Sequence, residues 1–127
     1  IEGLVRTHGI TYSTQDNVLI LSDVGLATND ADGGLIVIKN FSSVLNATTN
    51  MGTIAMNNQV RIYGPTSLLG NPVDVAYDHV TNDIYVAERL NGGGRVLKFA
   101  FPATNGDFAP TTSRIEAGVT ALYLLRR

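Results

Sequence analysis

The stretch 71–101 constrains the fold of this chain most, because much of the remaining sequence reads as a copy of it. Its residues 72–78 and 83–87 form two extended runs around a polar turn, and the second run is rich in the Ile, Tyr and Val that suit a pleated sheet. Glycines 92–94 supply the positive φ angles of a second reversal before a third run at 95–101. The pattern predicts three antiparallel strands in a meander.

A fourth strand is predicted at 113–117, after a loop at 102–112 in which Pro, Gly and Asn interrupt regular pairing. Four antiparallel strands in about 46 residues are the unit of a β-propeller blade. The module therefore has the length and strand count of one blade.

The upstream sequence repeats this module. Residues 34–39 match 94–99, and downstream the residues 119–123 match 73–77. The two copies of the first hairpin share a tyrosine, a turn asparagine and a final acid, each 65 residues apart: Tyr12 and Tyr77, Asn17 and Asn82, Asp23 and Glu88. The chain thus holds two copies and the opening strand of a third.

We expect one incomplete all-β domain over 1–127, built of four-stranded antiparallel propeller blades. Blade one covers about 7–68 with an insertion at 41–58, blade two about 71–117, and the first strand of a third blade 118–125. Helix should be nearly absent apart from one turn at 41–45. The expected strands lie near 9–13, 18–23, 35–39, 60–63, 73–78, 83–88, 95–101, 113–116 and 120–124.

The middle strands of the repeat indicate how the two copies pack. Residues 18–21 and 84–86 are apolar without clean alternation, which indicates strands covered on both faces. Neighbouring blades of a propeller supply that cover. We therefore predict that Ile20, Val86 and Leu97 are core positions.

The pattern Asp78-x-x-Thr81-Asn82-Asp83-Ile84-Tyr85-Val86-Ala87 resembles the first hairpin of the NHL, YVTN and gluconolactonase-like group of extracytoplasmic propellers, and residues 9–21 are a looser version. The resemblance implies a periplasmic, cell-surface or secreted protein, and a C-terminal two-blade portion of a bacterial propeller protein of unassigned function. Binding modules and hydrolases share this signature, so it specifies fold rather than function.

Two blades do not close a propeller, which takes roughly four to eight. They would leave an apolar blade face open at each end, together with free strand edges. We therefore expect either self-association, with a trimer of two-blade units as the simplest ring, or packing against the remainder of a longer parent chain.

Composition excludes several classes of function. Nine basic and eleven acidic residues form no basic stripe, so nucleic acid is not expected as a partner. No run approaches the ~18 apolar residues of a membrane span, so we expect no membrane insertion. The lack of cysteine removes disulfides, thiol nucleophiles and thiolate metal sites.

Blade topology brings the start of the first strand and the end of the second to one face, near the central channel. The ligand-face candidates there are His8, Asp23, Asn71, Asp74, Glu88 and Arg89. The resembling hydrolases hold a divalent cation with Glu, Asn and Asp at this mouth, which implies Ca²⁺ or Mg²⁺ on Asp23, Asp74 and Glu88. The alternative is structural, since an acid that ends a strand commonly pairs with an arginine such as Arg89 or Arg95.

A second cation candidate is the run Asn29, Asp30 and Asp32 before Gly33, which resembles the start of a calcium loop but lacks the distal Glu. A solvated turn is the alternative. The sequence has no Gly-x-Ser-x-Gly elbow, no histidine pair at ligand spacing and no phosphate-cradling loop, so we assign no catalytic residue and expect no cofactor.

Two functions remain. The first is a non-catalytic interaction or scaffold segment of a bacterial envelope or secreted protein. The second is part of a metal-dependent, lactonase-like hydrolase whose site needs further blades. The sequence identifies no small-molecule ligand.

Overall fold

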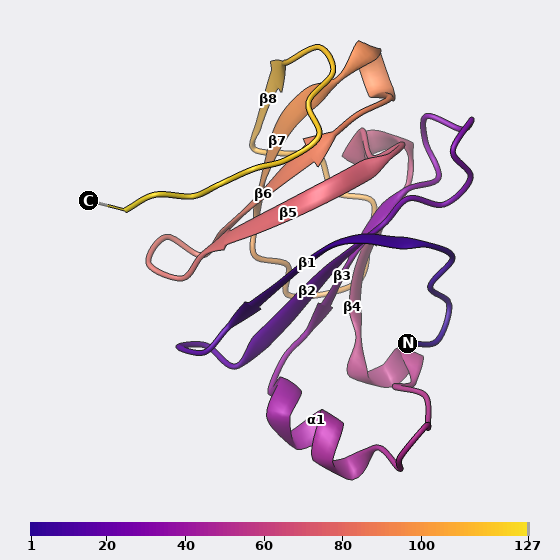
Figure 1. Cartoon of the computed structure of the whole chain (residues 1–127), viewed down its shortest axis with the longest axis vertical. Helices are drawn as coiled ribbons and strands as arrows, with labels where there is room; N and C mark the ends of the chain where they lie inside the picture. The colour runs from indigo at the N-terminus through magenta and orange to yellow at the C-terminus, as the bar shows by residue number, and fades with distance from the viewer. Residues whose placement is uncertain (127) are drawn as a thin grey trace.

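A computed structural model describes residues 1–126, which form two four-stranded antiparallel sheets (Figure 1). In each sheet the strands follow one another in chain order. The first sheet contains β1(Thr7–Ser13), β2(Val18–Asp23), β3(Gly34–Ile38) and β4(Val60–Tyr63). The second contains β5(Pro72–Asp78), β6(Asp83–Glu88), β7(Arg95–Ala100) and β8(Thr112–Ile115).

Eight of the nine predicted strands are confirmed. The bounds of β2, β4 and β6 are those predicted, and the other five differ by one or two residues. The strand predicted at 120–124 does not form: this segment runs beside β5, and the backbone N–H of Leu122 donates to the side chain of Asp74 instead of to a neighbouring strand.

Helix is more extensive than the single turn predicted. α1(Phe41–Ala47) spans two turns, and the 3-10 turns η1(Met56–Asn58), η2(Pro65–Ser67) and η3(Asn91–Gly93) lie in connections. The start of α1 is tied to the β1–β2 turn, because Phe41 donates its N–H to the Asn17 carbonyl at 2.9 Å and Ser42 donates its N–H to Asn17 Oδ1 at 3.0 Å.

Tyr12 and Tyr77 make matching contacts within their own sheets. Their hydroxyl oxygens lie 3.1 Å and 2.8 Å from Oδ1 of Asn17 and Asn82, the asparagines with φ angles of 54° and 57°. Their rings lie 5.7 Å and 5.6 Å from Phe41 and Phe101. The tyrosines that align in the sequence therefore each contact a turn asparagine and a phenylalanine.

The main core lies between the sheets, and the predicted core residues Ile20, Val86 and Leu97 are all fully buried in it. At the inner edge β1 and β5 approach backbone to backbone: a Cβ added to Gly9 would lie 2.7 Å from the Cα of Asp74. Aliphatic side chains from both sheets fill this core, among them Val18, Leu35, Val37, Ile62, Val75, Ile84 and Phe99.

The outer face of the first sheet is covered by its own chain. Leu19, Leu21, Ile36 and Ile38 form a second apolar cluster there with Ile54. Partly buried side chains of the N-terminal segment and of α1 pack against this cluster: Ile1, Leu4, Phe41 and Val44. We call these residues and Ile54 the self-cover. The expectation of an open apolar face at this end is therefore wrong, because the insertion 41–58 supplies the cover.

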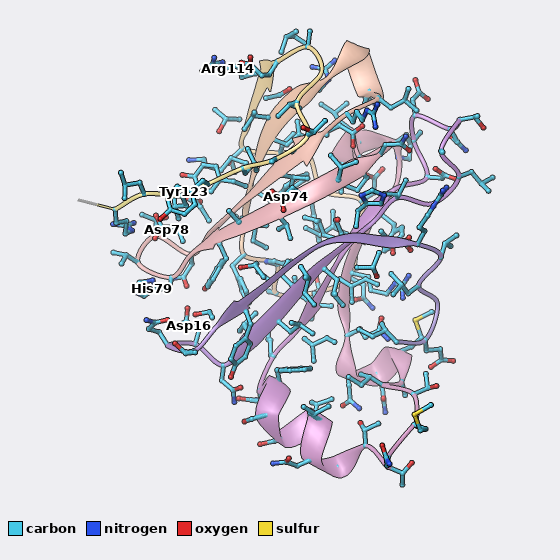
Figure 2. All side chains as sticks on the ribbon, in the orientation of Figure 1. Asp16, Asp74, Asp78, His79, Arg114 and Tyr123 are labelled. Atoms are coloured by element: carbon cyan, nitrogen blue, oxygen red, sulfur yellow. The ribbon has the colours of Figure 1, made fainter. Side chains whose placement is uncertain are left out.

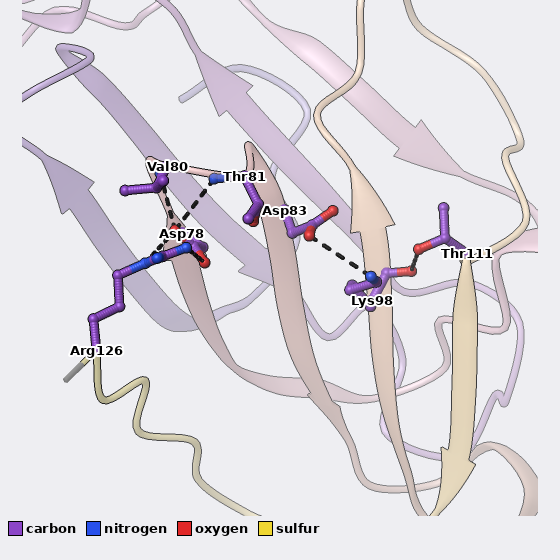
Figure 3. Close-up of polar contacts among 7 residues, drawn as sticks. All are labelled: Asp78, Val80, Thr81, Asp83, Lys98, Thr111 and Arg126. Carbon is purple, nitrogen blue, oxygen red and sulfur yellow. Dashed lines mark hydrogen bonds and ion pairs between the residues drawn. The ribbon is translucent and has the colours of Figure 1, made fainter.

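The outer face of the second sheet is mixed, because Ala87, Val96 and Ala100 lie on it together with one tyrosine and one lysine. Ile84 and Val86 face the main core, so the intervening Tyr85 points outward, as does Lys98 between Leu97 and Phe99. Lys98 forms an ion pair with Asp83 at 3.6 Å (Figure 3). Apolar and charged side chains therefore share the outer face of the second sheet.

The loop between β7 and β8 ties the second sheet to the outer edge of the first. Gly106 bridges to Ile62 of β4, and Tyr63 donates its N–H to the Gly106 carbonyl at 3.2 Å. Asp107 accepts the N–H groups of Thr66 and Ser67 at 3.0 Å and 2.9 Å. Part of the β4 edge is thereby paired.

Candidate functional site

The backbone pairing places the start of each first strand beside the end of each second strand, as the topology predicts. Thr7 pairs with Asp23 and Pro72 with Glu88, so each first strand begins where its neighbour ends. Arg89 donates its N–H to the Asn71 carbonyl at 3.0 Å. His8 and Arg89 have exposed side chains, whereas Asp23 and Glu88 are fully buried.

Asp23 accepts hydrogen bonds from the segment that leads into β1. Its carboxylate receives the N–H of Val5 at 2.9 Å and of Arg6 at 2.7 Å, and the Tyr63 hydroxyl at 2.9 Å. Burial alone would raise the pKa of Asp23, but these bonds together with the N–H of Gly25 outweigh it and hold the pKa below its ordinary value. Burial and the Asp23 carboxylate raise the pKa of Tyr63.

Glu88 has the same role in the second sheet. Its carboxylate accepts the N–H of Gly70 at 3.0 Å and of Asn71 at 2.8 Å, both in the segment that leads into β5. It also accepts the N–H groups of Leu90 and Asn91 at 2.8 Å and 2.9 Å. Among residues 1–126, neither Asp23 nor Glu88 forms an ion pair with an arginine. Each acid fixes the entry of a strand through backbone donors.

The loop predicted as a cation candidate lies at the same end. Asn29 Oδ1 accepts the Ala31 N–H at 3.1 Å, and Asp32 Oδ2 accepts the Leu26 N–H at 3.0 Å. The second sheet holds this loop through Asn71 and Asn91, whose amides donate to the carbonyls of Ala27 and Asp30 at 3.0 Å and 2.9 Å. Two acceptor oxygens in this region, Asp32 Oδ1 and Asn71 Oδ1, are buried without a donor.

The side chains at this face do not fit a Ca²⁺ or Mg²⁺ site. Backbone N–H groups direct their positive ends at the carboxylates of Asp23 and Glu88, where a cation would have to lie. Within the described residues no three His, Cys, Asp or Glu side chains gather as a ligand set. The two buried oxygens fall far short of the six to eight ligands, roughly, that Ca²⁺ takes.

Asp74 lies elsewhere, in a groove of about 500 Å³ between β1, β5 and residues 122–126. Its Oδ2 accepts the Leu122 N–H at 2.8 Å. His79 and Tyr123 line the same groove (Figure 2). Sequence reasoning placed Asp74 at the channel mouth but missed the groove, because the position of 119–126 depends on tertiary contacts.

Arg126, which lines the groove, pairs with Asp78 (Figure 3). Arg126 Nε donates to Asp78 Oδ1 at 2.8 Å, and its Nη2 contacts Oδ2. Asp78 Oδ1 also accepts the Val80 N–H at 2.9 Å. The Arg126 guanidinium holds the pKa of Asp78 well below its usual range, and the carboxylate in turn raises the pKa of Arg126.

In the part of the chain that the structure describes, no helix has the length and apolarity needed to cross a membrane. The chain matches no protein-family model, no curated protein and no solved structure.

Proposed function

We propose that this chain is a non-catalytic interaction segment made of two neighbouring β-propeller blades, each blade being one of the four-stranded sheets. The chain-order strand topology, the packing of the sheets face to face and the close approach of β1 to β5 support the blade assignment. The hairpin's resemblance to extracytoplasmic propellers supports an envelope or secreted bacterial protein as its source.

One observation supports the non-catalytic role: both acids at the predicted face accept hydrogen bonds from the backbone of their own chain. Asp23 and Glu88 are fully buried and accept backbone N–H groups. A hydrolase needs a nucleophile, an acid or base, or a metal-bound water within reach of a substrate. These two carboxylates reach no solvent-filled space, so they are structural.

The groove beside β5 suits binding better than catalysis. Its wall combines strand backbone, the Asp78–Arg126 pair, the exposed imidazole of His79 and apolar side chains such as Ile10 and Leu124. An extended peptide that binds beside a strand gains affinity from main-chain hydrogen bonds and specificity from side-chain contacts, and this groove offers both kinds of group.

A lactonase-like hydrolase whose centre needs further blades is the second candidate. The observation that favours it is the pair of buried acceptor oxygens, Asp32 Oδ1 and Asn71 Oδ1, which lack donors at the loop end of the sheets. Oxygens of this kind attract cations.

Metal binding and turnover separate the two candidates. The purified chain is stripped with chelator, and its melting is followed on addition of Ca²⁺ or Mg²⁺, alongside a lactone and phosphotriester hydrolysis screen. We expect no cation-dependent rise in melting temperature and no turnover. Stoichiometric cation binding that Asp32→Asn abolishes, accompanied by hydrolysis, would establish the hydrolase instead.

A further inference from the structure

The chain contains two Asn-Gly steps, Asn91-Gly92 and Asn105-Gly106. Such a step can modify itself, because the backbone nitrogen of the glycine can attack the amide carbon of the asparagine side chain and expel ammonia. Glycine permits this ring closure since it has no Cβ in the way. The first step lies between β6 and β7 and the second between β7 and β8, and their surroundings differ.

The side-chain amide of Asn91 is held at both of its polar atoms. Oδ1 accepts the Nε–H of Arg95 at 3.0 Å, and Nδ2 donates to the carbonyl of Asp30 at 2.9 Å. A guanidinium on Oδ1 draws electron density from the amide carbon, which makes that carbon a better electrophile. The guanidinium also lies where negative charge develops when a nucleophile adds, so it is a preorganised donor to the oxyanion.

The backbone nitrogen of Gly92 is free to act as the nucleophile. Within residues 1–126 its N–H donates no hydrogen bond, although the N–H groups of Asn91, Gly93 and Gly94 all do. Gly92 is exposed, so solvent can take its proton. A Cβ added to Gly92 would lie 2.5 Å from Arg95 Nη2, so the guanidinium lies beside the glycine as well as on the asparagine amide.

The step Asn105-Gly106 lacks this arrangement. The Gly106 N–H donates to the Arg61 carbonyl at 3.0 Å, so the nitrogen that would attack is bound to the edge of β4. Asn105 Oδ1 accepts a neutral donor, the Arg61 N–H, at 2.8 Å. Attack here requires the loop to leave β4. The chain therefore provides a matched comparison between a free and a bound Asn-Gly step.

We propose that Asn91 is a self-modifying site, at which Gly92 supplies the nucleophile and Arg95 stabilises the oxyanion. The Gly92 nitrogen loses its proton to solvent and forms a bond to Cγ of Asn91, while the carbonyl electron pair moves onto Oδ1. The bond from Cγ to Nδ2 then breaks, and Nδ2 leaves as ammonia after taking a proton from water. A water molecule opens the resulting five-membered imide at either carbonyl, which leaves an aspartate or an isoaspartate at position 91.

The modification changes how the loop between β2 and β3 is held. Two side-chain amides hold this loop: Asn91 donates to the Asp30 carbonyl, and Asn71 donates to the Ala27 carbonyl. The product has a carboxylate at position 91, which has no N–H to donate to Asp30 and instead accepts the Arg95 guanidinium. The loop is then held by one amide instead of two.

Rates of amide loss in the folded and the unfolded chain test the reaction. The purified chain is kept in mildly alkaline buffer with and without guanidinium chloride. Mass spectrometry quantifies the peptides that contain positions 91 and 105, and an isoaspartyl methyltransferase detects the isoaspartate. In denaturant we expect similar rates at the two positions. In the folded chain position 91 should react at least as fast as in denaturant, and position 105 several-fold more slowly. A slower reaction of position 91 in the folded chain than in the unfolded one overturns the proposal.

Two arginine variants test the oxyanion donor. Arg95→Gln should slow amide loss at position 91 several-fold and leave position 105 unchanged. Arg89→Gln removes a nearby exposed charge that does not contact the Asn91 amide, and should leave both rates unchanged. Arg95→Lys, which keeps the charge on a shorter reach, should give an intermediate rate and serves if the glutamine variant does not fold. Equal rates for the Arg95 and Arg89 variants would remove Arg95 from the mechanism.

Hydrogen exchange tests the effect on the loop. Ion-exchange chromatography separates the modified chain from the unmodified one, because the product carries an additional negative charge. We expect faster amide exchange over residues 24–33 in the modified chain and in Asn91→Asp, and no change over β2. Asn71→Asp removes the other amide and should have a similar effect. Unchanged exchange over 24–33 after modification would show that the Asn91 amide does not hold the loop, and would overturn this part of the proposal.

Discussion

The hydroxyl oxygen of Tyr77 in β5 lies 2.8 Å from Oδ2 of Asp16, in the turn between β1 and β2. This hydrogen bond joins the two sheets at the hairpin end, outside the apolar core. Within residues 1–126, the hydroxyl of the equivalent Tyr12 forms a hydrogen bond only with Asn17 of its own hairpin. The pair therefore offers an internal comparison between a contact that crosses the sheet interface and one that does not.

Tyr77→Phe should destabilise the protein more than Tyr12→Phe. A hydrogen bond to a charged acceptor contributes about 1.5–3 kcal/mol at most, and less where water competes, so we expect a difference of about 1 kcal/mol. Urea unfolding of the two variants measures it. Equal losses, or a larger loss for Tyr12→Phe, would mean that the Asp16 contact does not hold the sheets together.

Val86→Asp tests whether the sheets form one sandwiched core. Val86 is fully buried between them, and an unpaired carboxylate there should cost several kcal/mol, roughly 3 or more, or prevent folding. Val80→Asp is the matched control, since Val80 is 59% exposed in the turn between β5 and β6. Soluble expression and thermal melting compare them, and unchanged melting of Val86→Asp would rule out the sandwich.

Neighbouring residues on α1 test the self-cover. Val44 packs on the second apolar cluster, whereas Leu45 is half exposed and lies outside it. We expect Val44→Asn to cost about 1–2 kcal/mol and to increase binding of an apolar dye, and Leu45→Asn to change stability by less than about 0.5 kcal/mol. If both variants behave alike, the helix does not cover the sheet.

The strands were predictable because their signals are local. Alternating or continuous apolar runs and the turn residues Asn17 and Asn82 mark them within a few residues of sequence. The self-cover was not predictable in this way: Phe41, Val44 and Ile54 show no strand periodicity, and their apolar partners lie in the first sheet. The same limit applies to residues 119–126, whose apolar pattern resembles a strand although none forms there in the described chain.

Strand topology predicted where Asp23 and Glu88 lie, but not what they bind, and it did not predict the groove that contains Asp74. The acids at the ends of β2 and β6 do share one end of the sheets, as strand topology requires. Most of their partners, however, are backbone N–H groups, among them those of residues 17 and 18 positions earlier, and every residue except proline carries such a donor. A side-chain motif could not reveal them. The recurrence of an acid at both strand ends was the available signal.

The lowered pKa of Asp23 predicts how stability depends on pH. Hydrogen bonds in the folded chain outweigh burial and hold this carboxyl below its ordinary value of 3.8, so folding favours its ionised form. The stabilisation is therefore fully present above the unfolded pKa and is lost as the pH falls through the lower folded pKa.

Below about pH 4 the wild-type protein should lose stability steadily, and Asp23→Asn, less stable at neutral pH, should lose less over that range. Urea midpoints measured between neutral and strongly acid pH test this, with the exposed Asp30 as the control site. Parallel acid profiles for wild type and Asp23→Asn would show that other carboxyls govern the acid transition.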